Sequence, residues 1–296
     1  MVISFRKVSE LSFDEAVRIW NLGFEGYSLP MTITLEAYMR RTINEGLSLE
    51  HSLVFYVGDE PAGFVLNGFR DINGKRIAWN GGTAIAPTYR GKAIGKKLML
   101  KNLELYREQG VDIATLEALD QNEPAIKLYE HVGYEIMDRL VLLQHECPMS
   151  STLFEQLDHH SYTITKGLPR DVNEISFYQR LSPWQTGWQS MKEGESLIIK
   201  QGSEVVGYAL YKRGYDKEGQ LIDITLYQCE VLPGHNDAEM IYTIVLGELF
   251  APLDYLCKRK VFNLRESNQL LNVLLGKMGF KTTIKQVFMV RTMDKE

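Results

Sequence analysis

Hydrophobic residues change from a strand-like to a helix-like spacing between residues 76 and 107. Residues 76–86 form a mostly apolar run, and Pro87 ends it because proline has no amide hydrogen to donate to a neighbouring strand. From residue 94 onward, apolar positions recur at helical spacing while charged residues occupy the opposite face. These apolar positions are Ile94, Leu98, Met99, Leu103 and Tyr106. The pattern predicts a strand, a tight turn and a helix.

The turn between this strand and helix has the composition of an anion site. Small residues at Gly91, Ala93 and Gly95 let a ligand approach the backbone. The first amide groups of a helix have no acceptor within it, and the helix dipole favours negative charge there. No acidic residue lies between Arg90 and Leu103, a stretch whose basic residues are Arg90, Lys92, Lys96, Lys97 and Lys101. We therefore expect a phosphate group at this turn, although the lysines alone are also typical of a solvated helix face.

A second motif follows the strand-like segment 111–119 and connects the turn to a known family. The residues that carry this motif are Asn122, Ala125, Leu128, Tyr129, Gly133 and Tyr134. Together with Arg90 and Gly95, it resembles the GCN5-related N-acetyltransferases (GNAT), whose acyl-CoA loop reads Arg/Gln-x-x-Gly-x-Gly/Ala and whose next motif reads Asn-x-x-Ala-x-x-Leu-Tyr-x-x-x-Gly-Phe. Ala93 stands where the family usually has glycine. The resemblance covers about residues 1–146.

Length and composition narrow the class of protein. A chain of 296 residues is typical of two domains, and 45% apolar with 24% charged residues is ordinary for a soluble protein without a membrane-spanning run. The start of the chain lacks the pattern of a secretory signal, so we expect a cytoplasmic protein that binds no membrane. The three cysteines have no metal-ligand spacing, which predicts neither a metal site nor a disulfide scaffold. A net charge of −5 disfavours nucleic-acid binding.

The two halves of the chain resemble each other. The segment Leu53–Leu66 aligns with Leu197–Leu210, 144 residues later, and each reads as two apolar strands around a glycine turn. Asn122–Tyr134 aligns with Asn268–Phe280 at a separation of 146 residues. We interpret this as two copies of one α/β unit. The predicted domains are residues 1–148 and 161–296, joined by a linker at 149–160.

The second copy has lost the features of the anion site. At the same separation, the segment 236–241 replaces residues 90–95. The glycines and the arginine are gone, and the segment contributes two acids, Asp237 and Glu239. Acidic side chains repel a polyphosphate, so we expect this copy not to bind CoA at its turn. It can bury an edge of the first domain, shape the acceptor pocket or form the contact of a homodimer. The sequence does not choose among these.

The resemblance implies a fold and a donor site. It implies two tandem GNAT-like α/β domains, each a mixed, mostly antiparallel twisted sheet flanked by helices, with acetyl-CoA as the acyl-donor substrate. In the family, a backbone amide of the strand before the turn polarises the thioester carbonyl, a role that falls here on Ile85. Asn122 either caps the next helix or contacts CoA. The residues expected to hold the pyrophosphate are Arg90, Gly91, Lys92, Ala93, Ile94, Gly95 and Lys96.

The resemblance also implies catalytic roles. Tyr129 matches the tyrosine that protonates the departing CoA thiolate in many members of the family, whereas without the family it reads as a packed core aromatic. Glu117 and Glu25 are two candidates for a general base, and family members also pass this proton to water. The aromatic residues Phe24, Tyr27 and Trp79, with Met31, can line an acceptor pocket or belong to the core.

We expect an N-acetyltransferase in which a primary amine attacks acetyl-CoA directly in a ternary complex. The fold does not fix the acceptor, which can be a small molecule or a peptide. The alternative is a non-catalytic acyl-CoA sensor or assembly module.

Overall fold

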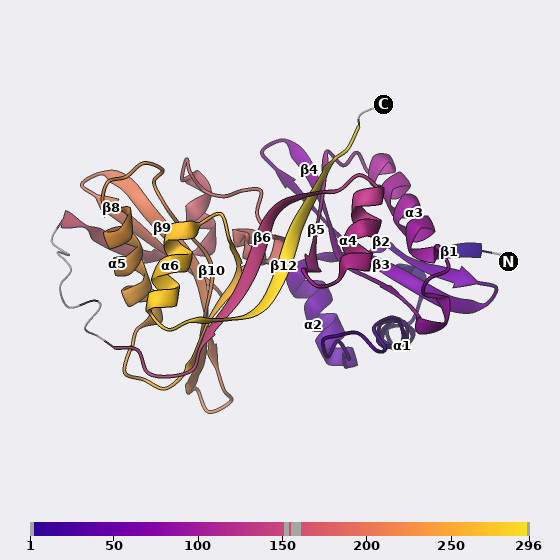
Figure 1. The fold of residues 1–296 in the computed structure, drawn as a ribbon, viewed down its shortest axis with the longest axis horizontal. Coiled ribbons are helices and arrows are strands. Elements are labelled where there is room, and N and C mark those ends of the chain that lie inside the picture. The colour runs from indigo at the N-terminus through magenta and orange to yellow at the C-terminus, as the bar shows by residue number, and fades with distance from the viewer. Residues whose placement is uncertain (1–2, 151–153, 155–160, 295–296) are drawn as a thin grey trace. The chain divides into compact units, whose positions relative to one another are not determined.

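The computed structural model describes residues 3–150, 154 and 161–294. The chain divides into two compact units, the first formed by Met1–Met137 with Phe288–Glu296 and the second by Asp138–Val287 (Figure 1). The last strand therefore begins in the second unit and ends in the first. The predicted linker at 149–160 lies largely outside the described residues, and the predicted domain bounds stay a prediction. Among the described residues, no helix is both long and apolar enough to span a membrane.

The first unit contains strands in the order β1-β2-β3-β4-β5-β12. Neighbouring strands from β1 to β4 are antiparallel, whereas β4 and β5 are parallel. Its strands are β1 (Ile3–Lys7), β2 (Leu47–Val57), β3 (Glu60–Ile72), β4 (Lys75–Ile85), β5 (Ile113–Leu119) and the end of β12 (Lys281–Thr292). Its helices are α1 (Phe13–Gly23), α2 (Leu35–Glu45), α3 (Ile94–Glu108) and α4 (Glu123–His131). The predicted strand, turn and helix around residue 90 are thus confirmed.

The second unit repeats this plan in the order β6-β11-β10-β9-β8-β7. Its parallel pair is β10 with β11, and β6 pairs with β11 in antiparallel fashion. The elements are β6 (Glu135–His145), β7 (Thr163–Gly167), β8 (Glu195–Gln201), β9 (Glu204–Tyr215), β10 (Leu221–Val231), α5 (Ala238–Phe250), β11 (Lys258–Arg265) and α6 (Gln269–Lys277). Short 3-10 helices within residues 169–190 precede β8, where the first unit has α1 and α2 before β2.

Strand pairing confirms the repeat residue by residue. Leu53 pairs with Val65 in the first unit, and Leu197 pairs with Ala209 in the second, so both members of the pair move by 144 positions. The register shift after Phe55 recurs after Ile199. Helices α4 and α6 have the same length, and each is capped by the asparagine before it. The prediction of two tandem α/β units, each a mixed sheet flanked by helices, is therefore confirmed.

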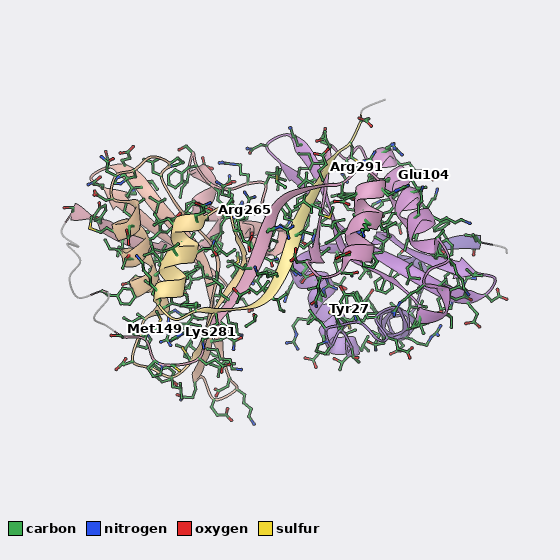
Figure 2. The ribbon with its side chains drawn as sticks, viewed as in Figure 1. Tyr27, Glu104, Met149, Arg265, Lys281 and Arg291 are labelled. Carbon is green, nitrogen blue, oxygen red and sulfur yellow. The ribbon has the colours of Figure 1, made fainter. Side chains whose placement is uncertain are left out.

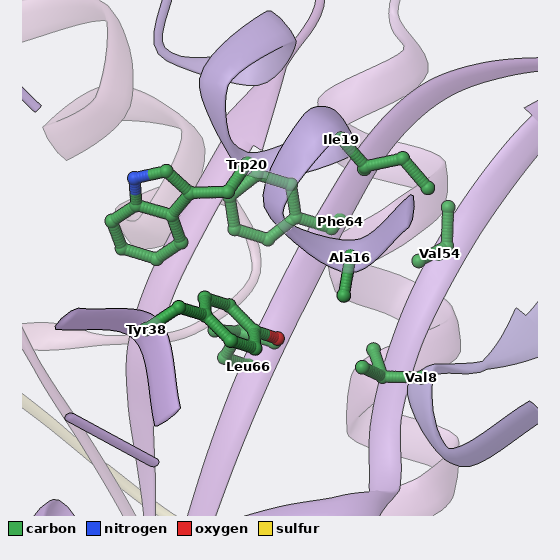
Figure 3. A pocket seen from close by; sticks show the side chains of 8 residues that line it. All are labelled: Val8, Ala16, Ile19, Trp20, Tyr38, Val54, Phe64 and Leu66. Atoms are coloured by element: carbon green, nitrogen blue, oxygen red, sulfur yellow. The ribbon is translucent and has the colours of Figure 1, made fainter. Parts of the chain in front are cut away.

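Helix α1 packs tightly on the sheet of the first unit. The Ser12 hydroxyl accepts a hydrogen bond from the Glu15 amide at 3.2 Å, which caps the helix start. At the other end, a Cβ on Gly23 would lie 2.8 Å from a ring carbon of Phe64, so only glycine allows this approach. Below the helix lies a cavity of about 10 Å³, enough for one water (Figure 3). It is lined by Val8, Ala16, Ile19, Trp20, Tyr38, Val54, Phe64 and Leu66.

Candidate active site

A cleft opens in the first unit where β4 and β5 separate. The two strands pair only over residues 77–80 and 113–116, although β4 continues to Ile85 and β5 to Leu119. The cleft has a volume of about 590 Å³. It is lined by Gly23, Phe24, Tyr27, Thr83, Ala84, Ile85, Tyr89, Arg90, Gly91, Ala93, Ile94, Gly95, Lys96, Asn122, Pro124, Ala125, Leu128 and Tyr129. Volumes of this size accommodate small-molecule ligands.

The turn before α3 presents unpartnered backbone amides to the cleft. Gly91 and Ala93 have φ values of 74° and 57°, in the left-handed region that turns the chain sharply into the helix. Lys97 is the first residue of α3 whose amide finds a helical acceptor, the Ala93 carbonyl at 3.4 Å. Among the described residues, no acceptor is found for the backbone amides of residues 91–96. Such amides at a helix start favour an anion.

The side chain of Arg90 contacts the backbone of neighbouring segments. Its guanidinium donates to the carbonyl oxygens of Ile85 at 2.9 Å, Gly23 at 2.9 Å and Glu25 at 2.7 Å. These bonds tie the segment after α1 to the end of β4. Sequence reasoning placed Arg90 near the pyrophosphate and missed this contact, because Gly23 and Glu25 lie more than 60 residues away in the chain.

The lysines of the turn differ in position. Lys96 lines the cleft, whereas Lys92 is not among the lining residues and has its ammonium 5.6 Å from the centre of the Tyr89 ring. Lys97 is exposed on the next position of α3 and does not line the cleft either. Of the three, Lys96 therefore has the position for charge contact with a bound anion.

Tyr129 on α4 is part of the lining of the cleft. It is buried, and its hydroxyl forms a hydrogen bond with the side chain of Thr83 on β4. Burial raises the pKa of Tyr129 to about 12, while the bond with Thr83 lowers the pKa. The phenol therefore keeps its proton at neutral pH and can donate it. Sequence reasoning named Tyr129 but could not pair it with Thr83, 46 positions earlier.

Asn122 both caps α4 and lines the cleft, the two places that the sequence allowed. Its side-chain oxygen accepts from the Ala125 amide at 3.3 Å, which caps α4, and the residue also lines the cleft. Its side-chain nitrogen donates to the hydroxyl of Tyr27 at 3.3 Å. Tyr27 comes from the segment between α1 and α2, and Figure 2 shows its position. Asn122 thus links this segment to α4.

The two candidate bases are not brought together at the cleft. The carboxylate of Glu117 accepts from the indole nitrogen of Trp79 at 2.7 Å, and Trp79 is buried. Glu25 is exposed, and its backbone oxygen is an acceptor for Arg90. Neither glutamate lines the cleft. Of the four apolar residues considered for an acceptor pocket, Phe24 and Tyr27 line the cleft and form an edge-to-face pair with ring centroids 5.3 Å apart.

Comparison with known proteins is consistent with this geometry. Residues 15–134 match the model of the acetyltransferase (GNAT) family. An uncharacterised N-acetyltransferase of Escherichia coli, YjgM, is 44% identical over 52 residues, which are 18% of this chain. The matching stretch spans only 31% of that relative's length.

Solved structures show the same fold over nearly the whole chain. A GCN5-related N-acetyltransferase from Anabaena variabilis matches with a TM-score of 0.60 and 17% identity, over 99% of this chain and 73% of that one. A tandem GNAT protein from the clavulanic acid biosynthesis pathway matches with a TM-score of 0.58 and 12% identity, over all of both chains. Residues 15–134 are thus similar to the acetyltransferase (GNAT) family, and the solved structures show a likeness of fold over nearly the whole chain.

Proposed function

We propose that the first unit transfers the acetyl group of acetyl-CoA to a primary amine, by direct attack in a ternary complex. One observation carries this proposal: a single cleft has the unpartnered amides of the turn on one wall and the protonated phenol of Tyr129 on another. The first suits a pyrophosphate and the second suits a leaving thiolate. The acceptor is a small molecule or a peptide.

The amides of residues 91–96 and the ammonium of Lys96 would hold the pyrophosphate of the donor. The arrangement of β4 supports a role for Ile85. The Ala86 amide donates to Ala62 on β3 at 2.9 Å, and Ile85 faces Gly63 in the same ladder. Because successive amides of a strand point to opposite sides, the Ile85 amide is directed away from β3, toward the edge from which β5 has separated. This amide can donate to a thioester carbonyl in the cleft.

The reaction then balances with few groups. The amine nitrogen attacks the thioester carbonyl carbon, the carbon–sulfur bond breaks, and the sulfur takes the proton of Tyr129, which then regains a proton from water. The amine loses a proton to water in this proposal, because neither Glu117 nor Glu25 lines the cleft. Either glutamate remains a candidate base through bridging water. Positioning of donor and acceptor in one cleft supplies much of the rate.

The second unit does not bind CoA at its turn in this proposal. The carboxylate of Asp237 accepts from the Tyr162 hydroxyl at 3.1 Å, and Glu239 forms an ion pair with Lys277 at 3.3 Å. Two acids at the start of α5 oppose a polyphosphate there. Acetyl-CoA should therefore bind once per chain. Cytoplasmic location and homodimer formation stay predictions from the sequence.

The test is calorimetric titration with acetyl-CoA of the wild type and of two charge reversals on α3. Lys96→Glu places a carboxylate on the wall of the cleft, and we expect it to weaken acetyl-CoA by about ten-fold or more. Lys97→Glu makes the same charge change at an exposed position outside the cleft and serves as the control. Equal affinities of the two variants would remove the anion site from the proposal.

Activity is tested separately by thiol release with a panel of primary amines. Two acetyl-CoA sites per chain would overturn the assignment of the second unit. Donor binding without thiol release from any amine or peptide would favour the sensor or assembly module.

A further inference from the structure

The second unit has a cleft of its own at the place where β10 and β11 separate. These strands pair over residues 223–226 and 258–261, and β10 then continues to Val231. The cleft has a volume of about 420 Å³. It is lined by Gln179, Glu230, Val231, Leu232, Pro233, Gly234, Ala238, Tyr242, Arg265, Ser267, Asn268, Gln269 and Leu270. The second unit therefore has a cleft at the equivalent place, although its turn lacks the features of the anion site.

Glu230 is the acidic residue in the lining of this cleft, and its side chain is partly buried. Its carboxylate accepts from the side-chain nitrogen of Asn268 at 3.2 Å, and it is also hydrogen-bonded by the hydroxyl of Tyr242. Among the described residues, no ion pair within 4.0 Å involves Glu230. A carboxylate held in a poorly solvated site without a cation in direct contact is costly, so the site favours a further positively charged partner.

The charged and titratable groups around Glu230 come from three other elements. Arg265, at the end of β11 and labelled in Figure 2, also lines the cleft. Its guanidinium donates to the Leu181 carbonyl and contacts the Gln179 side chain at 3.5 Å. Asp138 on β6 adds negative charge, and Tyr242 on α5 is neutral because burial raises its pKa. Arg265 thus moderates the negative potential at Glu230 without forming an ion pair with it.

Part of the lining is apolar. The cleft has hydrocarbon surface from Val231, Leu232, Pro233, Ala238 and Leu270, beside the polar side chains of Gln179, Ser267 and Gln269. Hydrocarbon surface beside polar groups in one cleft is typical of small-molecule sites. We propose that this cleft binds a small organic amine, whose ammonium group contacts Glu230 and whose hydrocarbon part lies against these apolar residues. This site is separate from the proposed acetyl-transfer site.

The state of Glu230 makes this binding depend on pH. Burial raises the pKa of Glu230 to about 7, against the effects of Arg265, Asn268 and Tyr242, which lower it. Well below pH 7 the carboxyl is mostly neutral and attracts an ammonium weakly. Amine affinity should therefore rise at least ten-fold between pH 5.5 and 8, because the ionised fraction rises by more than that. In turn, a bound ammonium should lower the pKa of Glu230.

The experiment uses the full chain with phenethylamine and butylamine as probes, and 2-phenylethanol and 1-butanol as their neutral counterparts. Binding is measured by calorimetry, and the Glu230 carboxyl is followed by carbon NMR. We expect each amine to bind at least ten-fold more tightly than its alcohol, and Glu230→Gln to remove this preference. Glu239→Gln, at an exposed ion-paired acid outside the cleft, should keep it. Acetyl-CoA affinity should be unchanged in both variants.

Two binding results and one titration result would overturn the proposal. One is equal binding, or absence of binding, of the amines and their alcohols at pH 8. The other is an amine preference that survives Glu230→Gln. A Glu230 carboxyl that titrates near pH 7 both with and without amine would show a buried acid with only a structural role.

Discussion

Replacement of Tyr129 by phenylalanine removes one hydroxyl from the cleft and little else. The ring stays in place against Tyr134, whose centroid is 6.1 Å away. Thr83 loses its bond with Tyr129 but keeps the Asn80 side chain as a partner, at 2.8 Å from the amide nitrogen and 3.0 Å from the oxygen. Because no polar group is left without a partner, we expect the free energy of unfolding to change by less than about 1 kcal/mol.

The rate should change much more than the stability. A positioned general acid contributes about 10²- to 10⁴-fold to a rate, so we expect Tyr129→Phe to lower kcat by at least about ten-fold. The donor contacts are carried by the turn amides and Lys96, and the Kd of acetyl-CoA should therefore change less than about two-fold. Thiol release at saturating donor and amine measures kcat, and calorimetry measures the Kd.

Tyr134→Phe is the matched control. This tyrosine is buried beside Tyr129, and its hydroxyl has no hydrogen-bond partner in the described part of the chain. This variant also loses one phenolic hydroxyl, but Tyr134 does not line the cleft. Turnover equal to wild type in Tyr129→Phe would refute the role of the phenol as proton donor. A comparable loss in both variants would instead trace the effect to packing of α4.

Three further predictions concern stability. Arg90→Gln removes three hydrogen bonds to backbone oxygens and should lower the free energy of unfolding by about 1–2 kcal/mol. Arg107→Gln, at the exposed end of α3, should change the free energy of unfolding little. Urea titration measures both variants, and equal values would contradict the linking role of Arg90. Tyr38→Phe should raise the melting temperature or leave it unchanged, because no hydrogen bond of the Tyr38 hydroxyl is found among the described residues. Tyr106→Phe loses a 2.7 Å hydrogen bond to Asn67 and should lower the melting temperature by about 2–4 °C. The free energy of unfolding should fall as the pH rises from about 10 to 12, because folding raises the pKa of Tyr38 and Tyr129 to about 12 while tyrosines of the unfolded chain ionise near 10. Each tyrosine contributes up to about 2.7 kcal/mol to this loss. The check is a smaller loss in Tyr38→Phe and in Tyr129→Phe than in the wild type.

The sequence by itself determined the local elements and the repeat. Apolar periodicity located β4 and α3, since each pattern depends only on neighbours along the chain. The hairpin at Leu53–Leu66 and its copy at Leu197–Leu210 were recognisable because the same register needs the same spacing of apolar residues and turn glycine. Most of the residues proposed for the donor site line the cleft for the same reason, since they are consecutive in the turn.

Only the tertiary structure decided which distant groups meet. The separation of β4 from β5 forms the cleft, and it brings Thr83 to Tyr129 and Arg90 to Gly23, pairs that no local pattern encodes. For Glu117 the sequence predicted a place at the cleft from its position on β5, but its carboxylate instead accepts a hydrogen bond from Trp79. Glu230 gave no signal in the sequence, since its environment comes from Tyr242, Arg265 and Asn268 on three other segments. Local pattern fixes an element, whereas the environment of a side chain depends on contacts far along the chain.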